Sequence, residues 1–238
     1  MPFPNWLSGG RTDLTDRVRR ALELADEGEP GAGERQVSRE FSAALKALKI
    51  VRGPRDTSRL QIEAAWLYRS GEMEAAEGAA EESLQGSDNA WTWNLLGKIL
   101  VWTGDLSRAQ GAFGRAARLR PDVYVVPYRV SRERFDAMAE RALQGIPERY
   151  QLELGNTLIV TDDLPSIEMV REGEDPDLLG IYEGATALEH GLPERIVLYQ
   201  RNHENLSADE ATLVRLVEET MRHEAGHHFG MDEDELPY

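Results

Sequence analysis

Apolar residues recur every three or four positions through most of the first 120 residues, which is the period of amphipathic α-helices. Short stretches rich in glycine or helix-capping residues separate these segments. The pattern predicts six helices, at Leu14–Asp26, Glu34–Lys49, Arg59–Arg69, Met73–Leu84, Ala90–Val101 and Leu106–Leu119. Because the connections between them are short, we expect consecutive helices to pair as antiparallel hairpins.

The last of these hairpins has the pattern of a helical repeat. The positions that define it are Trp93, Leu96, Gly97, Leu100, Gly104, Ala109, Phe113, Ala116 and Pro121. They resemble the tetratricopeptide repeat, a helix–turn–helix of about 34 residues. Weaker copies precede it at Leu60–Ala80 and Val37–Ala44. We therefore expect about three tetratricopeptide-like hairpins, with an ordinary amphipathic helical bundle as the alternative.

After Pro121 the helical period gives way to shorter apolar runs. VYVVPYRV is β-branched and aromatic, which is typical of a linker leading into a strand. Ser131 then precedes an amphipathic helix over residues 132–143. Three strands are predicted, within residues 156–162, 178–184 and 195–200.

A long C-terminal helix is predicted to follow the strands. Ser207, with Glu210 three residues later, has the spacing of a capping box, and Gly230 is a stop signal, so we expect a helix over residues 208–229. The predicted fold class is α+β, with all-α hairpins in residues 1–122 and a small helix-flanked sheet in residues 123–238.

Composition and charge narrow the classes of partner. The 238 residues include 43 Asp and Glu against 27 Lys and Arg, a formal net charge of −16, which argues against nucleic acid or an anionic membrane. The absence of cysteine excludes disulfides, thiolate metal sites and cysteine nucleophiles. The first residues lack a secretory-signal pattern, and no apolar run approaches the ~18 residues of a membrane span. We expect a cytoplasmic protein.

The candidate chemistry lies at the end of the long helix, where residues 223–227 read H-E-x-x-H. Residues four apart share one face of a helix, so the imidazoles of His223 and His227 can bind one Zn²⁺. The carboxylate of Glu224 can then act as general base on a water that the metal activates. A helix end at which histidines merely favour the negative pole of the dipole is the alternative interpretation.

A third ligand has to come from the remaining residues or from upstream. Gly230 can turn the chain back, and H-E-x-x-H-x-x-G-x-x-E places Glu233 where the metzincin pattern has its third histidine. Glu233 is the predicted third ligand. Asp232 is the nearest alternative and Asp234 the next.

The other histidines are weaker candidates. His228 lies about 100° around the helix from His227, which favours a supporting or packing role. His190 and His203 fall in polar stretches, so we expect both to be exposed.

The LLGIYEG run, residues 178–184, is a candidate substrate-binding strand. Glycines at Gly180 and Gly184 would let a peptide backbone approach closely, and the Tyr182 hydroxyl could stabilise an oxyanion. An ordinary core strand with turn glycines is the alternative.

Residues from about 130 to 236 resemble the small bacterial zincin-like metallopeptidase family, a minimal zincin first catalogued as a domain of unknown function. The stretches that carry the resemblance are FDAMAERALQGIPERY, NTLIVTDDLP, LLGIYEG, LPERIVLYQ and HEAGHHFGMDEDEL. The resemblance implies a compact zincin fold whose metal is held by the two motif histidines and an acidic residue after the glycine. Glu233 fits that last position.

Three functional hypotheses follow. The first is a zinc-dependent metallopeptidase that acts on a peptide or protein, with helical repeats that recruit or shield it. The second is an interaction protein whose repeats bind a protein partner and whose zinc site is structural or vestigial. The third, a metal carrier, is disfavoured because the histidines keep helical register. Glu224 favours the enzyme, since a structural zinc site needs no free carboxylate beside the metal.

Overall fold

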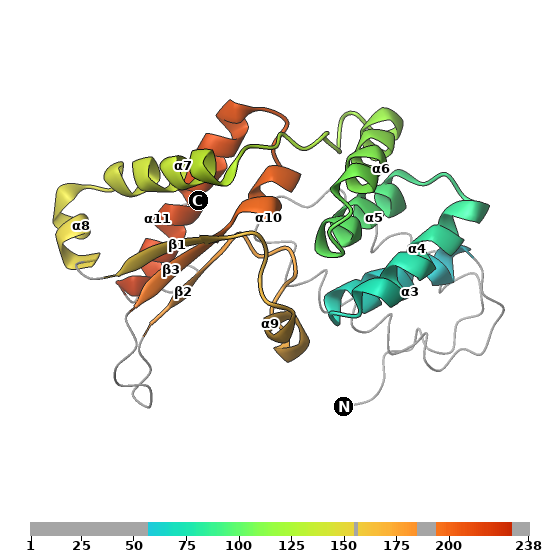
Figure 1. The fold of residues 1–238 in the computed structure, drawn as a ribbon, viewed down its shortest axis with the longest axis horizontal. Helices are drawn as coiled ribbons and strands as arrows, with labels where there is room; N and C mark the ends of the chain where they lie inside the picture. Colours follow the sequence, from blue (N-terminus) through green and yellow to red (C-terminus); the bar gives the residue numbers. More distant parts are fainter. Residues whose placement is uncertain (1–56, 155–156, 185–193, 230–238) are drawn as a thin grey trace, which may run out of the picture. The chain divides into compact units, whose positions relative to one another are not determined.

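The computed structural model describes residues 57–154, 157–184 and 194–229 (Figure 1). The chain divides into two compact units, Met1–Tyr124 and Val125–Tyr238. The two helices expected before residue 50 lie outside the described residues. Within the described part, none of the helices has the length and apolar character that crossing a membrane requires.

The described part of the first unit consists of two helical hairpins. Its helices are α3 (Thr57–Arg69), α4 (Met73–Gly86), α5 (Ala90–Trp102) and α6 (Leu106–Leu119). The sequence prediction of these four helices is confirmed to within two residues at each end. α5 and α6 begin 33 residues after α3 and α4 respectively, so the hairpin recurs at constant spacing.

Glycine and short polar side chains set the geometry of the second hairpin. A Cβ at Gly97 in α5 would lie 2.8 Å from the ring of the fully buried Phe113 in α6, so the missing side chain permits the close packing of these helices. Gly104 takes a φ of 84° in the turn between them. Asn89 and Asp105 cap the two helices by accepting hydrogen bonds from backbone N–H groups.

The second unit is mixed helix and sheet. Its elements are α7 (Arg132–Gln144), α8 (Glu148–Leu154), β1 (Leu158–Asp162), α9 (Ile167–Glu172), β2 (Gly180–Glu183), β3 (Arg195–Tyr199), α10 (Gln200–Asn205) and α11 (Glu210–His228). The sheet has the order β1-β3-β2, with β1 parallel and β2 antiparallel to the central strand. The predicted α+β class is confirmed for this unit.

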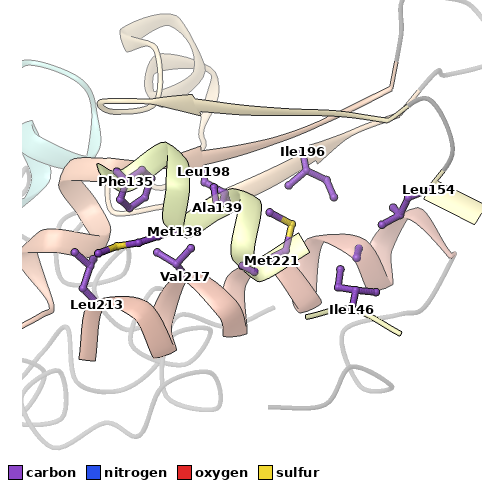
Figure 2. Close-up of a cluster of buried hydrophobic side chains, with 12 residues drawn as sticks. Phe135, Met138, Ala139, Ile146, Leu154, Ile196, Leu198, Leu213, Val217 and Met221 are labelled. Atoms are coloured by element: carbon purple, nitrogen blue, oxygen red, sulfur yellow. The ribbon is translucent and has the colours of Figure 1, made fainter. Parts of the chain in front are cut away.

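Helices α7 and α11 pack on one face of the sheet and form the main core with it (Figure 2). Phe135 of α7, Leu198 of β3 and Val217 of α11 are fully buried there. Gly180 is opposite Leu198, and Tyr182 is opposite Ile196, which belongs to the same core. Because paired residues of antiparallel strands point to one face, Gly180 and Tyr182 face α11.

The long helix does not begin as predicted. Its cap is Asp209, whose carboxylate accepts a hydrogen bond from the Thr212 N–H at 2.8 Å. Ser207 is buried and donates its hydroxyl to the His203 carbonyl at 2.8 Å, so it is not free to cap α11. The capping-box prediction at Ser207 is therefore wrong.

Two further differences concern short elements. The run at residues 123–130 forms no strand, and the Tyr128 N–H instead donates to the Ser207 carbonyl at 2.8 Å. The short helices α8, α9 and α10 were not predicted, and α10 begins where the third strand was expected to end. These three are seven residues or fewer, too short for a helical period to stand out.

Candidate active site

His223 and His227 lie on the same side of α11, near its C-terminal end. Their Nε2 atoms are 3.2 Å apart, and their rings meet edge to face with centroids 4.8 Å apart. The i, i+4 spacing on a regular helix produces this arrangement. Both residues are partly exposed.

The distance between these nitrogens suits a metal ion. Two nitrogens bound at about 2.0–2.1 Å to one tetrahedral zinc lie about 3.3 Å apart. Imidazole is also a preferred zinc ligand, so the donor set fits the ion. Among residues 57–154, 157–184 and 194–229, no three His, Asp or Glu side chains converge as a metal site. Glu233, Asp232 and Asp234 lie outside those ranges.

Glu224 lies on the neighbouring face of α11 and packs under the edge strand. Its side chain is 6% exposed. A Cβ at Gly180 would come within 3.1 Å of the Glu224 Cγ and 2.8 Å of the Thr220 Cγ2. The bare backbone at Gly180 therefore lets β2 lie directly over the carboxylate side chain. Gly180 was predicted to let a substrate backbone approach β2. In the structure it also lets the side chains of α11 approach the strand from the interior.

Tyr182 of β2 and His228 of α11 are in contact. The Tyr182 hydroxyl is 3.2 Å from the His228 Nδ1, and the two rings meet edge to face with centroids 5.4 Å apart. The Glu194 carboxylate lies 3.1 Å from the same Nδ1. Burial raises the pKa of Tyr182, and the nearby negative charge of Glu194 raises it further, so the phenol stays protonated at neutral pH.

Gly184 makes room for this tyrosine. A Cβ there would lie 2.8 Å from both the hydroxyl oxygen and the Cε1 of Tyr182. The two predicted substrate-strand glycines thus both border side chains of the site. Glu194 was missed from the sequence, because no pattern distinguishes one loop carboxylate from its neighbours.

His203 is not exposed, contrary to the sequence interpretation. It lies in α10, is fully buried, and its ring packs against Phe135 at 5.5 Å. Its Nδ1 is 2.9 Å from the Tyr199 carbonyl and its Nε2 is 3.0 Å from the Thr220 hydroxyl. A carbonyl only accepts, so Nδ1 carries the hydrogen, and Nε2 of the neutral ring faces the Thr220 hydroxyl.

The residue after it, Glu204, is also buried, and it accepts several hydrogen bonds. The donors are the Arg129 guanidinium at 2.9 Å, the Val130 N–H at 3.0 Å, the Gln200 amide at 2.9 Å and the Arg201 guanidinium at 3.0 Å. Such a buried carboxylate is tolerated because it is paired and hydrogen-bonded. It ties α10 to the segment that enters α7, and His203 ties α10 to α11. His190 lies outside the described residues.

Comparison with protein-family models concerns the C-terminal part of the chain. Residues 154–238 match the family model described as Zincin-like metallopeptidase. The matched range contains β1, β2, β3 and α11, and with them the His223, Glu224 and His227 cluster. A search of curated proteins returned no match. The C-terminal part of the chain, residues 154–238, is thus similar to zincin-like metallopeptidases.

Proposed function

We propose that the zincin-like domain is a zinc-dependent peptidase. The observation that carries the proposal is how the side chains of one turn of α11 are arranged. His223 and His227 present two nitrogens at a separation suited to zinc, while Glu224 points to the adjacent face under the edge strand. A structural zinc site would have no use for that carboxylate.

His223 and His227 would hold the metal, with Glu233 as the third ligand and Asp232 as its nearest rival. Zinc bound there would supply a Lewis acid that lowers the pKa of a bound water and polarises a carbonyl. The metal would have to enter with the imidazoles neutral, so acidification would release it.

Glu224 would serve as the general base. Its carboxylate would take a proton from the attacking water and pass it to the leaving amine as the peptide bond breaks. Its position beneath β2 supports this role, because the outer edge of that strand is where an extended peptide would add as a further strand. The Tyr182 hydroxyl would donate a hydrogen bond to the carbonyl oxygen of the scissile bond.

A second role falls to the helical hairpins. Two hairpins that recur every 33 residues and pack through small residues such as Gly97 have the character of tetratricopeptide repeats. Such repeats commonly bind protein segments, which favours recruitment of a protein substrate or partner. If the enzyme hypothesis fails, this binding becomes the main function, with a structural zinc site beside it.

The proposal is tested by metal analysis and a peptide-library digest of the full-length protein. We expect one zinc per chain, cleavage that disappears on chelation and returns with zinc, and weaker zinc binding in His223→Ala and Glu233→Ala. Comparison of Glu233→Ala with Asp232→Ala assigns the third ligand. Zinc binding without any cleavage of the library would favour the scaffold.

A further inference from the structure

α11 has a polar stripe that faces the edge strand, separate from the pair of metal-binding histidines. Thr220, Glu224 and His228 are four residues apart, so they share one side of the helix. Thr220 and Glu224 pack under Gly180, and His228 contacts Tyr182. Glu224 thus has, one turn before it and one turn after it, a polar side chain that contacts another element.

The contact before Glu224 is anchored in the core. Thr220 is 7% exposed and shares a hydrogen bond of 3.0 Å with the buried His203. This contact fixes the middle of α11 relative to α10. The contact between Thr220 and His203 holds α11 in place, but it involves neither Tyr182 nor the end of β2.

The contact after Glu224 is made by His228. Its Nδ1 is 3.2 Å from the Tyr182 hydroxyl and 3.1 Å from the Glu194 carboxylate, and the Tyr182 hydroxyl also hydrogen-bonds Glu194. Tyr182 belongs to β2, and Glu194 immediately precedes β3. One imidazole nitrogen therefore joins the last turn of α11 to two strands of the sheet.

The tyrosine ring has little freedom in this cluster. It lies next to the bare backbone of Gly184 and meets the His228 ring edge to face. A ring held by an aromatic contact and a hydrogen bond keeps its strand in place. The position of β2 over Glu224 is thus set from both ends, at Gly180 and at Tyr182.

We propose that His228 is a positioning residue that acts through Tyr182. By holding β2 against the last turn of α11, it sets how far a peptide added to the strand edge lies from the Glu224 carboxylate. The inference deepens the proposed function and rests on it for its catalytic consequence. The structural part, that His228 holds β2, stands on the contacts alone.

The test compares full-length, zinc-loaded variants at His228. His228→Asn keeps an amide N–H near the position of Nδ1, whereas His228→Ala removes the donor. Tyr182→Phe removes only the hydroxyl. Arg222→Ala, on the exposed face of the same helix, is the control for substitutions near the metal site.

Three quantities are measured: amide hydrogen exchange of residues 180–183, zinc affinity by chelator competition, and kcat and KM on a peptide from the library digest. For His228→Ala and Tyr182→Phe we expect exchange in β2 to quicken about fivefold, as for loss of one hydrogen bond. In His228→Ala, KM should rise more than kcat falls, and zinc affinity should change less than about threefold. Tyr182→Phe should show the same zinc affinity but a larger fall in kcat, because it also loses the donor proposed for the scissile carbonyl. His228→Asn should restore exchange and KM, and Arg222→Ala should resemble wild type.

Unchanged exchange in His228→Ala would overturn the inference. A loss of zinc affinity of about tenfold or more would also overturn it, because that is the effect of a residue that supports the metal instead. Absence of hydrolysis by the wild-type protein would overturn the proposed function. In that case the exchange data still decide whether His228 holds β2, so the two failures are distinguishable.

Discussion

The imidazole of His203 is enclosed by Phe135, the Tyr199 carbonyl and Thr220, with no exposed surface. Burial lowers its pKa from 6.5 to about 4, because a charged ring would lose its hydration. Hydrogen bonding to the Tyr199 carbonyl and the charge of Glu204 act in the opposite direction but do not prevail. At neutral pH the ring is uncharged in both the folded and the unfolded chain.

This residue should make stability depend on pH between about 6.5 and 4. In that pH range His203 is protonated in the unfolded chain but not in the folded chain, so the free energy of unfolding decreases as the pH falls. The shift from 6.5 to about 4 corresponds to about 3 kcal/mol of lost stability at the lower end. Urea unfolding of wild type and His203→Asn across this range should show a shallower loss in the variant. Equal slopes would mean that His203 is charged inside the fold.

At the scale of elements, the contact between β2 and α11 determines where Glu224 lies. The Gly180 backbone is close to Thr220, Glu224 and the Val197 carbonyl, so a methyl group there has no free space. Side chains can turn away from such a group, but a carbonyl of the central strand cannot move without disturbing the sheet.

Gly180→Ala should therefore separate the strand from the helix. We expect a stability loss of about 1–3 kcal/mol from overpacking and a fall in peptide hydrolysis of about 100-fold, because misplacement of about 1 Å costs that much. Zinc affinity should stay near that of wild type. Ile181→Val, on the opposite face of β2, should cost about 1 kcal/mol or less and keep activity. A Gly180→Ala protein with wild-type hydrolysis would show that the spacing of β2 and α11 is unimportant.

The sequence predicted elements correctly where a hydrophobic pattern repeats along the element. It failed for short elements that are held by contacts with distant residues. The four helices of the hairpins, the sheet strands and the His223–His227 pairing all follow from local pattern. α10 does not, because its polar sequence is buried by partners such as Arg129, which lies more than seventy residues away in the chain. Distant partners also bury His203, which packs against Phe135 and lies next to Thr220. A single sequence gives no sign of such long-range pairing.

For the whole molecule, the chain divides into two compact units, one with the helical hairpins and one with the zincin-like part. Each described unit has its own buried residues, such as Phe113 in the hairpins and Phe135 in the domain. A change confined to the hairpins should thus leave the chemistry of the domain intact.

Gly97→Ala is a local way to test that separation. The new methyl group would meet the Phe113 ring at 2.8 Å, so we expect the hairpins to lose about 1–3 kcal/mol of stability. Gly111→Ala in α6 is the matched control, since a Cβ there meets nothing within 4 Å. Calorimetry should show the hairpin transition shift downward in Gly97→Ala alone, with zinc affinity and hydrolysis of a short peptide unchanged. Loss of zinc affinity in this variant would show that the units depend on each other.

The most direct test of the central claim is Glu224→Gln, with zinc content and peptide hydrolysis measured on the same preparation. The substituted amide side chain would preserve the size and the burial under Gly180 but could not accept a proton as a base. We expect zinc content close to that of wild type and hydrolysis reduced by at least about 100-fold, as for loss of a general base. Hydrolysis at the wild-type rate, with zinc still bound, would contradict the assignment of Glu224 as the base and with it the proposed peptidase mechanism.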